Sequence, residues 1–514
     1  MKKILVIVVF GFLIYGLSLY NGFVWDDEVS FSSLKNIPTA GVYFRPAISA
    51  VYSTIYNIFG PQPFFFHFSQ LIFHITTAIL IFNIFKCFFK ENLSLILTLI
   101  FLVHPANVEA VSFASAMQEV GFTLVGIFGL YLFVIPVKTG IQDDIKKHEN
   151  DLFIKIFFGT FLLFTALLMK ETAIVFFVLV FGYLLLFKRK PSDVLVSYSI
   201  FAVIFLMTYS LFRLSGGNLY VQGQGLFPIM RVSLATRLIN IPSIIQYYLS
   251  MFLYPINLAI AQHWVIKFPN FINFFLPLII ETLLFLAVVA FFIKKKNKIF
   301  AFFFLWFLIG LLPHLQIIPL NMTVAERWLY FPMIGLLGMI GSIIKISNIK
   351  NQKSKILFSF AIIIIFVLSV RSFVRTLDWR NGLSLYSRDI RKDSSFDLQN
   401  NMGVELFRIG RYEEAKKYFE ISTQLAPYWW VNWNNLGASF EREKNYKKAA
   451  DYYQKSINNG QYYLAYENLA KTLILQGKNQ KKTEKFLQTA IKLFPENQNL
   501  LQMNTYFQEK NSHK

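Results

Sequence analysis

The sequence predicts an all-α protein with a polytopic membrane domain of about eleven helical spans, followed by a C-terminal α-solenoid of about three repeats. Hydrophobic residues make up 55% of the chain and charged residues only 15%, a balance that polar surface cannot cover in water. Apolar runs near twenty residues, long enough to cross a bilayer, recur up to about residue 373. Residues 395–514 are instead polar. We therefore assign 1–378 to the membrane domain, 379–394 to a linker and 395–514 to the repeats.

The basic residues indicate membrane sidedness. The net charge is +21, but the cations gather in short loops beside apolar runs, as at 188–190 and 294–298, which is typical of cytoplasmic loops and argues against nucleic acid. Lys2 and Lys3 place the N-terminus in the cytoplasm. The first apolar run lacks a small-residue cleavage site, so we expect an uncleaved span. Cys87 is the only cysteine, which excludes a disulfide within the chain.

The same charge pattern decides which runs cross the membrane. Segment 238–258 would send the 294–298 cluster outside if it crossed, and Pro242 and Pro255 would interrupt its backbone bonds. We therefore expect it to lie along the outer face. The expected crossings are the run that ends near Tyr20 and those at 67–89, 93–110, 117–136, 152–169, 172–187, 193–213, 271–293, 299–318, 329–346 and 355–373. This topology puts the C-terminal repeats on the outer side.

The polar tail repeats at the tetratricopeptide period. Asn401, Asn435 and Asn468 each open a short similar motif, at intervals of 34 and 33 residues. Ala415 and Ala449 occupy the small position where paired helices touch, while the third repeat needs one inserted residue. About three repeats is close to the minimum for a stable array. We expect the array to bind a protein partner; the alternative is a passive spacer.

Acidic residues stand at the membrane edge directly after the first span. Asp26, Asp27 and Glu28 are consecutive, and like charges at close range raise the basicity of a carboxylate that could accept a hydroxyl proton. The alternative is an ordinary solvated loop. Arg45 precedes an amphipathic helix expected at 47–59, where it could bind a lipid phosphate or merely extend to the headgroups.

Further ionisable residues fall on the same expected face. His104, Glu109 and Glu119 are close together in the sequence. They could be metal ligands, but no second histidine is nearby. For His104, a hydrogen bond that caps a helix end is favoured. Two adjacent opposite-charge pairs follow, and because adjacent residues on a helix do not face each other, both cations could point into a shared pocket. These pairs are Lys170–Glu171 and Glu326–Arg327.

These motifs together resemble the tetratricopeptide-containing, multispanning O-mannosyltransferase-like proteins, which have the C-type glycosyltransferase (GT-C) fold. The chain departs from their pattern at 115–119, where the arginine of a Ser-Gly-Arg-like run is missing. The matching residues are spread over most of the membrane domain: Phe23-Val24-Trp25-Asp26-Asp27, Tyr43-Phe44-Arg45-Pro46, His67, His74, His104-Pro105, Glu109-Ala110-Val111, Lys170-Glu171-Thr172 and Glu326-Arg327-Trp328-Leu329-Tyr330.

The resemblance implies transfer of a sugar from a polyprenyl-phosphate carrier to an acceptor, possibly a protein hydroxyl, on the outer face of a membrane, which we expect to be a bacterial inner membrane. Asp26 or Asp27 would accept the hydroxyl proton. Arg45, Lys170 and Arg327 would hold the lipid phosphate as its charge grows, and the remaining membrane-edge residues would complete the substrate site. No glycine-rich phosphate loop is present, and a lipid donor explains that.

Other interpretations stay open at this point. The two aspartates could bind a divalent cation in front of the phosphate, although the resemblance favours a transferase without a metal or other cofactor. A transporter, a ligase for lipid-linked glycans and a noncatalytic scaffold that binds partners through its repeats are the competing functions. Expected partners are membrane lipid, the lipid-linked sugar and a protein, and not nucleic acid.

Overall fold

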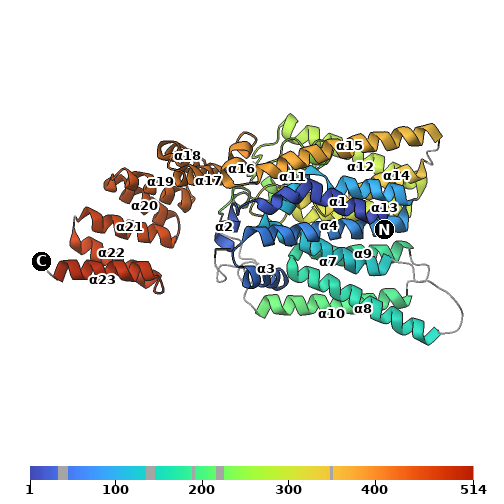
Figure 1. Ribbon diagram of the computed structural model, residues 1–514, viewed down its shortest axis with the longest axis horizontal. Coiled ribbons are helices and arrows are strands. Elements are labelled where there is room, and N and C mark those ends of the chain that lie inside the picture. Colours follow the sequence, from blue (N-terminus) through green and yellow to red (C-terminus); the bar gives the residue numbers. More distant parts are fainter. Residues whose placement is uncertain are drawn as a thin grey trace. The chain divides into compact units, whose positions relative to one another are not determined.

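The computed structural model describes residues 1–32, 44–134, 145–187, 192–215, 225–347, 351–477 and 479–512. The chain divides into two compact units, Met1–Asn381 and Gly382–Lys514. Helices build both, which confirms the all-α prediction (Figure 1). Within the described ranges, β-pairing amounts to one isolated bridge between Gln262 and Val324.

The membrane unit consists of long apolar helices joined by short helical turns. Its α-helices are α1 (Lys2–Tyr15), α2 (Asp26–Ser30), α3 (Pro46–Phe59), α4 (Pro63–Phe88), α5 (Glu91–Leu102), α6 (Val108–Ser112), α7 (Met117–Val134), α8 (Ile145–Met169), α9 (Ile174–Phe187), α10 (Ser192–Ser215), α11 (Leu234–Leu253), α12 (Leu276–Lys295), α13 (Lys298–Leu311), α14 (Pro332–Ile346) and α15 (Asn351–Asp378). Short turns η1 (Gly16–Tyr20), η3 (Pro105–Asn107), η4 (Ala114–Ala116), η5 (Glu171–Ala173), η6 (Pro228–Arg231), η7 (Phe271–Phe275), η8 (Leu312–His314) and η9 (Glu326–Leu329) connect or extend them.

The described helices account for part of the expected span count. Eight are long and apolar enough to cross a membrane, and a bent pair, Glu91–Leu102 with Pro105–Ser112, can make a ninth. The two other expected crossings correspond to shorter apolar helices, Glu171–Phe187 and Lys298–His314. The chain is thus a multi-pass membrane protein, and the count of eleven stays a prediction. Helix α11, which contains Pro242, is not among the span candidates, in agreement with its expected non-spanning role.

The bent pair turns by 53° where Pro105 interrupts the helix. Such a break frees backbone carbonyls, which must find partners because lipid offers none. The hydroxyl of Tyr15 and the ring of His74 both bond the Leu102 carbonyl, at 3.1 and 3.0 Å. Ser372 donates to the Val103 carbonyl at 2.6 Å. Helices α1, α4 and α15 therefore hold the break in place.

Glycines allow close helix contact inside the membrane unit. A Cβ at Gly129 of α7 would stand 2.9 Å from the carbonyl of Gly159 in α8, and one at Gly335 of α14 would stand 2.5 Å from the backbone nitrogen of Phe307 in α13. Small residues let backbones approach where packing, rather than the hydrophobic effect, drives association in lipid.

The two ends of the membrane unit differ in chemistry. At one end, Lys3 pairs with Glu91 at 3.1 Å, and Lys345 donates to the Phe88 carbonyl at 2.8 Å. Figure 1 shows α2 and α3 at the opposite end of this unit from the N-terminus. Helix α2, which begins at Asp26, and helix α3, which follows Arg45, therefore lie at the other end from Lys3.

The second unit is a helical repeat array. Helices α17 (Phe396–Arg408) and α18 (Tyr412–Leu425), α19 (Trp430–Arg442) and α20 (Tyr446–Asn459), and α21 (Tyr463–Gln476) and α22 (Gln480–Leu493) form three pairs, and α23 (Gln498–Ser512) follows. Ala415 and Ala449 are fully buried, as expected of the small position. Part of the segment expected as a linker, 379–394, forms helix α16 (Gly382–Asp389), and this helix packs on α17.

Candidate functional site

The two aspartates of the first acidic cluster differ in their burial. Asp27 is fully buried, and its carboxylate accepts hydrogen bonds from the backbone nitrogens of Ala114, at 3.2 Å, and Ser115, at 2.7 Å. Burial raises the pKa of Asp27 from 3.8 to about 7, against the opposing effect of these hydrogen bonds. Asp26 is exposed, and its charge adds to the rise. Asp27 is thus an anchor, whereas Asp26 faces solvent.

Backbone strain precedes this pair. Trp25 has φ 56° and ψ −128°, a conformation that a side chain with a Cβ rarely adopts. Such strain costs about 1–3 kcal/mol and persists only where surrounding contacts impose it. The bonds from Asp27 to the 114–115 backbone are one such contact.

The backbone that receives Asp27 is itself held from two sides. The Tyr52 hydroxyl of α3 donates to the Ala114 carbonyl at 3.1 Å. The side-chain amide of Gln70, on α4, donates to the carbonyls of Ala110 and Phe113 at 2.5 and 2.8 Å. The segment between α6 and α7 is therefore a fixed platform to which α2, α3 and α4 all bind.

Two arginines share one carboxylate beside this platform. Arg45 bonds Glu171 through Nε and Nη2, both at 2.9 Å, and donates to Gln118 at 2.7 Å. Arg213, at the end of α10, reaches the other oxygen of Glu171 at 3.3 Å. The three charged side chains keep between 16% and 29% of their surface exposed. We call Arg45, Glu171 and Arg213 the arginine cluster; its formal charge is +1.

Deeper ion pairs lie behind this cluster and are individually neutral. Lys170 pairs with Glu119, and both side chains are at most 7% exposed. Arg327 pairs with the fully buried Glu109, which also accepts a 2.9 Å bond from the Arg327 backbone nitrogen. Since an unpaired buried charge is costly, each carboxylate makes the neighbouring cation tolerable.

The adjacent charges in the sequence separate in the structure, as expected from helix geometry. Lys170 turns to Glu119 while Glu171 turns to the arginine cluster. Arg327 turns to Glu109, whereas Glu326 accepts a 3.3 Å bond from Arg375 on α15.

The histidines of the matching motifs, His67, His74 and His104, are buried. His104 accepts from the Ala106 nitrogen at 3.2 Å through Nδ1 and donates from Nε2 to the Phe252 carbonyl at 3.0 Å. The bond to Nδ1 caps the start of η3, which is the role that the sequence favoured for His104, and a part for His104 in the substrate site stays a prediction. His74 braces the bent pair and also bonds the Tyr330 hydroxyl at 2.8 Å, and His67 is fully buried.

Sequence reasoning missed Arg213 and Arg375. Both are cations at the end of a span where the charge pattern expects few, because the expected topology places these ends outside. This departure from the positive-inside pattern was the sequence signal that could have identified Arg213 and Arg375. Gln70 and Tyr52 carried no comparable signal, since their partners are backbone carbonyls.

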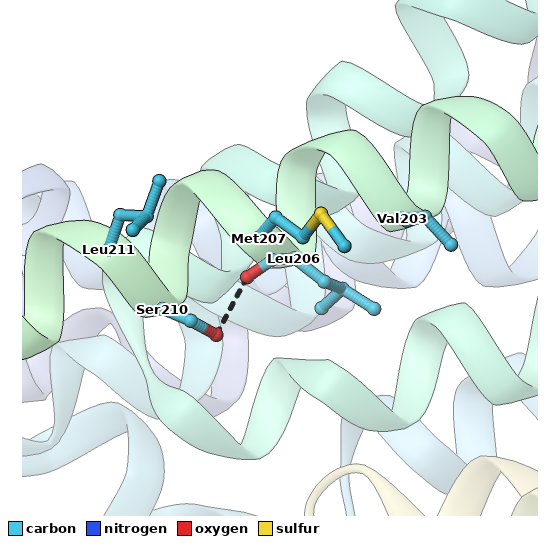
Figure 2. Close-up of a pocket in the computed structure, with 5 residues that line it drawn as sticks. All are labelled: Val203, Leu206, Met207, Ser210 and Leu211. Atoms are coloured by element: carbon cyan, nitrogen blue, oxygen red, sulfur yellow. Dashed lines mark hydrogen bonds between the residues drawn. The ribbon is translucent and has the colours of Figure 1, made fainter.

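The surface has shallow apolar hollows. Figure 2 shows one on α10 that is lined by Val203, Leu206, Met207, Ser210 and Leu211; the Ser210 hydroxyl donates to the Leu206 carbonyl at 2.8 Å. A second lies between α3 and α4 and is lined by Ala50, Val51, Thr54, Ile55, Phe68, Ser69, Ile72 and Phe73. Among the described residues, no group of three or more His, Cys, Asp or Glu side chains is placed to hold a metal ion.

Comparison with known proteins supports the resemblance seen in the sequence. A tetratricopeptide repeat family matches residues 396–428. The chain is 22% identical to human Protein O-mannosyl-transferase TMTC3 over 506 residues, which covers 83% of this chain and 52% of that protein. It is 33% identical to Drosophila melanogaster Protein O-mannosyl-transferase Tmtc2 over 108 residues, 20% of this chain and 11% of that one. The chain therefore spans about half the length of the curated relative that it matches over most of its own length.

Among solved structures, ArnT from Cupriavidus metallidurans bound to undecaprenyl phosphate matches with a TM-score of 0.44 and 11% identity, over 88% of this chain and 79% of that one. The score is too low for this likeness to support a function. The resemblance to tetratricopeptide-containing O-mannosyltransferase-like proteins rests on the sequence relatives and the repeats.

Proposed function

We propose that this chain, which resembles the tetratricopeptide-containing O-mannosyltransferase-like proteins over most of its length, is a membrane glycosyltransferase of the GT-C type. It transfers a sugar, with mannose the first candidate from the names of its relatives, from a polyprenyl phosphate to a protein hydroxyl. The acceptor side is the outer face of a bacterial inner membrane, with the N-terminus in the cytoplasm and the repeats outside.

The observation that carries this proposal is the arginine cluster. Arg45 and Arg213 supply two guanidinium groups to one carboxylate, Glu171, so the cluster carries a formal charge of +1 at a partly exposed position. Planar guanidinium groups match the oxygens of a phosphate, and their charge is worth most in a partly dry site. Lys170 and Arg327 are paired with Glu119 and Glu109 and add no net charge, so the arginine cluster supplies the positive charge of the site.

The lipid tail also has a candidate path. Helix α3 begins at Pro46, directly after Arg45, and the apolar hollow between α3 and α4 runs beside it. A prenyl chain in this hollow would leave its phosphate near the arginine cluster. Binding energy from the tail would then position the anomeric carbon for reaction.

The chemistry assigns different roles to the two aspartates. As the acceptor hydroxyl oxygen forms its bond to the anomeric carbon, the bond from that carbon to the phosphate oxygen breaks, and the electron pair leaves with the polyprenyl phosphate. The hydroxyl proton passes to Asp26, which is exposed. Asp27 positions Asp26 through its bonds to Ala114 and Ser115. Arg45 and Arg213 hold the leaving phosphate.

The test is transfer of radiolabelled mannose from a polyprenyl phosphate to a serine- and threonine-containing peptide, with the full chain in nanodiscs. Asp26→Asn is expected to lower kcat by about 10² or more, the usual contribution of a general base. Glu28→Gln, which alters the third acid of the same run, is the matched control and should stay within about threefold of wild type. Full transfer by the Asp26 variant would refute the assignment. Activity that EDTA removes and Mg²⁺ or Mn²⁺ restores would show that the acids hold a metal instead.

A further inference from the structure

We propose that Glu171, the carboxylate between Arg45 and Arg213, limits how tightly the arginine cluster retains the lipid phosphate once the sugar has left. Its negative charge weakens binding of the spent lipid more than binding of the sugar-carrying donor, because the two lipids differ in charge. The inference deepens the proposed function and rests on it for the identity of these lipids. It makes Glu171 a determinant of product release.

A carboxylate is an unexpected member of a site for phosphate. Glu171 meets Arg45 through Oε2 at 2.9 Å and Arg213 through Oε1 at 3.3 Å, so it lies between the two guanidinium groups. It takes up N–H groups that a phosphate could use, and it cancels one of two positive charges. Both effects weaken phosphate binding. The presence of Glu171 therefore needs a reason other than affinity for the donor.

Orientation of the arginines does not supply that reason, because neutral groups already hold both. Arg45 donates from Nη1 to the side-chain oxygen of Gln118 at 2.7 Å. Arg213 donates to the Tyr209 hydroxyl at 3.1 Å. A neutral amide in place of the carboxylate could also accept a bond from either arginine. The contribution that only a carboxylate makes is its negative charge.

The arginine cluster keeps donors for a ligand while Glu171 is in place. Both bonds of Arg213 leave from Nη1, so its Nε and Nη2 donors make no hydrogen bond within the described ranges of the chain. These two donors form one edge of the planar guanidinium, the arrangement that suits two phosphate oxygens. A phosphate and the Glu171 carboxylate can thus share the same arginine. The charge of Glu171 then acts on the bound lipid.

The proposed reaction changes the charge of the lipid phosphate. The donor is a phosphodiester and carries one negative charge. When the bond from the anomeric carbon to the phosphate oxygen breaks, the electron pair stays on that oxygen. The lipid is left as a phosphomonoester with a charge of about −2 near pH 7.5. The proton of the acceptor hydroxyl passes to Asp26, which balances the step. The product is therefore attracted more strongly than the donor to a cationic site.

The net charge of the cluster decides how large that difference becomes. Coulomb energy is proportional to the product of the two charges, so each unit of positive charge stabilises the bound product about twice as much as the bound donor. Lys170 and Arg327 add no net charge, because each is paired with its own carboxylate. With Glu171 ionised, the cluster carries +1 in place of +2, and the excess attraction for the product is halved. Release of product limits the rate of many enzymes.

The test compares two lipids with the same tail: farnesyl phosphate, a monoester, and farnesyl methyl phosphate, a diester with a single charge. Binding of the tritium-labelled lipids to the full chain in nanodiscs is measured at pH 7.5, with empty nanodiscs subtracted. Glu171→Gln removes the charge and keeps an acceptor, and Glu171→Asp keeps the charge. Arg213→Met changes the cluster charge in the opposite direction. Glu28→Gln is the matched control, because it removes one negative charge from the acidic run outside the cluster.

We expect Glu171→Gln to lower Kd about fivefold for the diester and about twenty-fivefold for the monoester, since a doubled free energy is a squared ratio. Glu171→Asp and Glu28→Gln should keep the ratio of the two Kd values within about twofold of wild type. Arg213→Met should weaken binding of the monoester at least about fivefold more than binding of the diester. An equal change for both lipids in either charge-changing variant, or weaker binding of the monoester by Glu171→Gln, overturns the inference.

The transfer assay separates failure of the inference from failure of the proposed function. Transfer that depends on Asp26, together with an equal shift of both lipids in Glu171→Gln, would leave the proposed function standing alone. Binding that follows the charge of the lipid as expected, without transfer, would refute only the transfer. Absence of binding of either lipid to wild type overturns the inference, because the cluster would then hold no phosphate.

Discussion

Substitution of Asp27 by Asn should change how the stability of the protein depends on pH. The folded carboxyl has a pKa of about 7, raised from 3.8 by burial, so the folded state holds its proton across a range in which the unfolded state has lost it. Stability is therefore greatest below pH 3.8 and falls as pH rises toward 7, where the folded group also ionises. Above pH 7 this contribution no longer changes.

The expected magnitude follows from that difference. About three pH units at about 1.4 kcal/mol each correspond to about 4 kcal/mol of destabilisation between acid and neutral pH. Between pH 5 and 7 the expected loss of stability is about 2 kcal/mol, because the folded carboxyl is already half ionised at pH 7. Asparagine does not titrate. It can accept one bond but directs an NH2 group at the second backbone donor, so the variant should be about 1 kcal/mol less stable than wild type at pH 5. Near pH 7, where burial of the charge disfavours wild type, the order should reverse.

The measurement is SDS-induced unfolding of the full chain in mixed micelles, followed by tryptophan fluorescence at pH 5, 6, 7 and 8. The quantity compared is the difference in unfolding free energy between wild type and Asp27→Asn, since other titrating groups cancel in it. Asp26→Asn, at the exposed neighbour, is the control; it should keep most of the pH dependence, because burial of Asp27 is unchanged, and lower the Asp27 pKa only slightly. Parallel curves for wild type and Asp27→Asn would show that burial of this carboxyl does not govern its titration.

Three further substitutions test other parts of the structure. Glu109→Ala should lower the unfolding free energy by about 3–5 kcal/mol in the same SDS assay, because it leaves the buried Arg327 uncompensated; a loss below 1 kcal/mol would contradict this. Arg213→Met should lower kcat/KM for the lipid donor about tenfold, because Arg213 holds the leaving phosphate, and an unchanged kcat/KM would argue against that contact. Gly437→Val places side-chain atoms against the Tyr453 ring, 2.7 Å from a Cβ, so trypsin should cleave the repeat unit faster; an unchanged cleavage rate would contradict this.

Much of the fold could be predicted because its signals are local in sequence. Apolar runs identified Pro63–Phe88 and Lys355–Asp378, and the asparagine motifs gave the repeat register. The break at Pro105 was harder to predict. Its carbonyls are satisfied by Tyr15, His74 and Ser372, residues remote in sequence, so nothing near the proline shows that the pair is bent and braced.

The sequence could predict which residues belong to the candidate site, but not which groups these residues bind in the structure. The sequence identified Asp27 and Glu109, because acids at a membrane edge are unusual, but gave no means to see that one binds backbone and the other an arginine 218 residues away. For His104 the sequence favoured a cap of a helix end, and its Nδ1 does accept a bond from the Ala106 nitrogen. Burial and pairing are tertiary properties, and they decide whether a charge serves the fold or faces a substrate.

Exchange of Lys170 and Glu171 tests whether the tertiary ion pairs, and not the sequence pattern alone, hold the fold. The double variant Lys170→Glu, Glu171→Lys keeps composition, net charge and span pattern, so the sequence would predict the same topology. In the structure it sets the new Glu against Glu119 and the new Lys against Arg45 and Arg213. Because breaking a buried pair costs about 3–5 kcal/mol, we expect most of the folded yield, measured by fluorescence-detected size exclusion, to be lost. Adding Glu119→Lys should restore part of it by re-forming the deeper pair; a wild-type yield from the exchanged chain would mean that these pairs do not hold the fold.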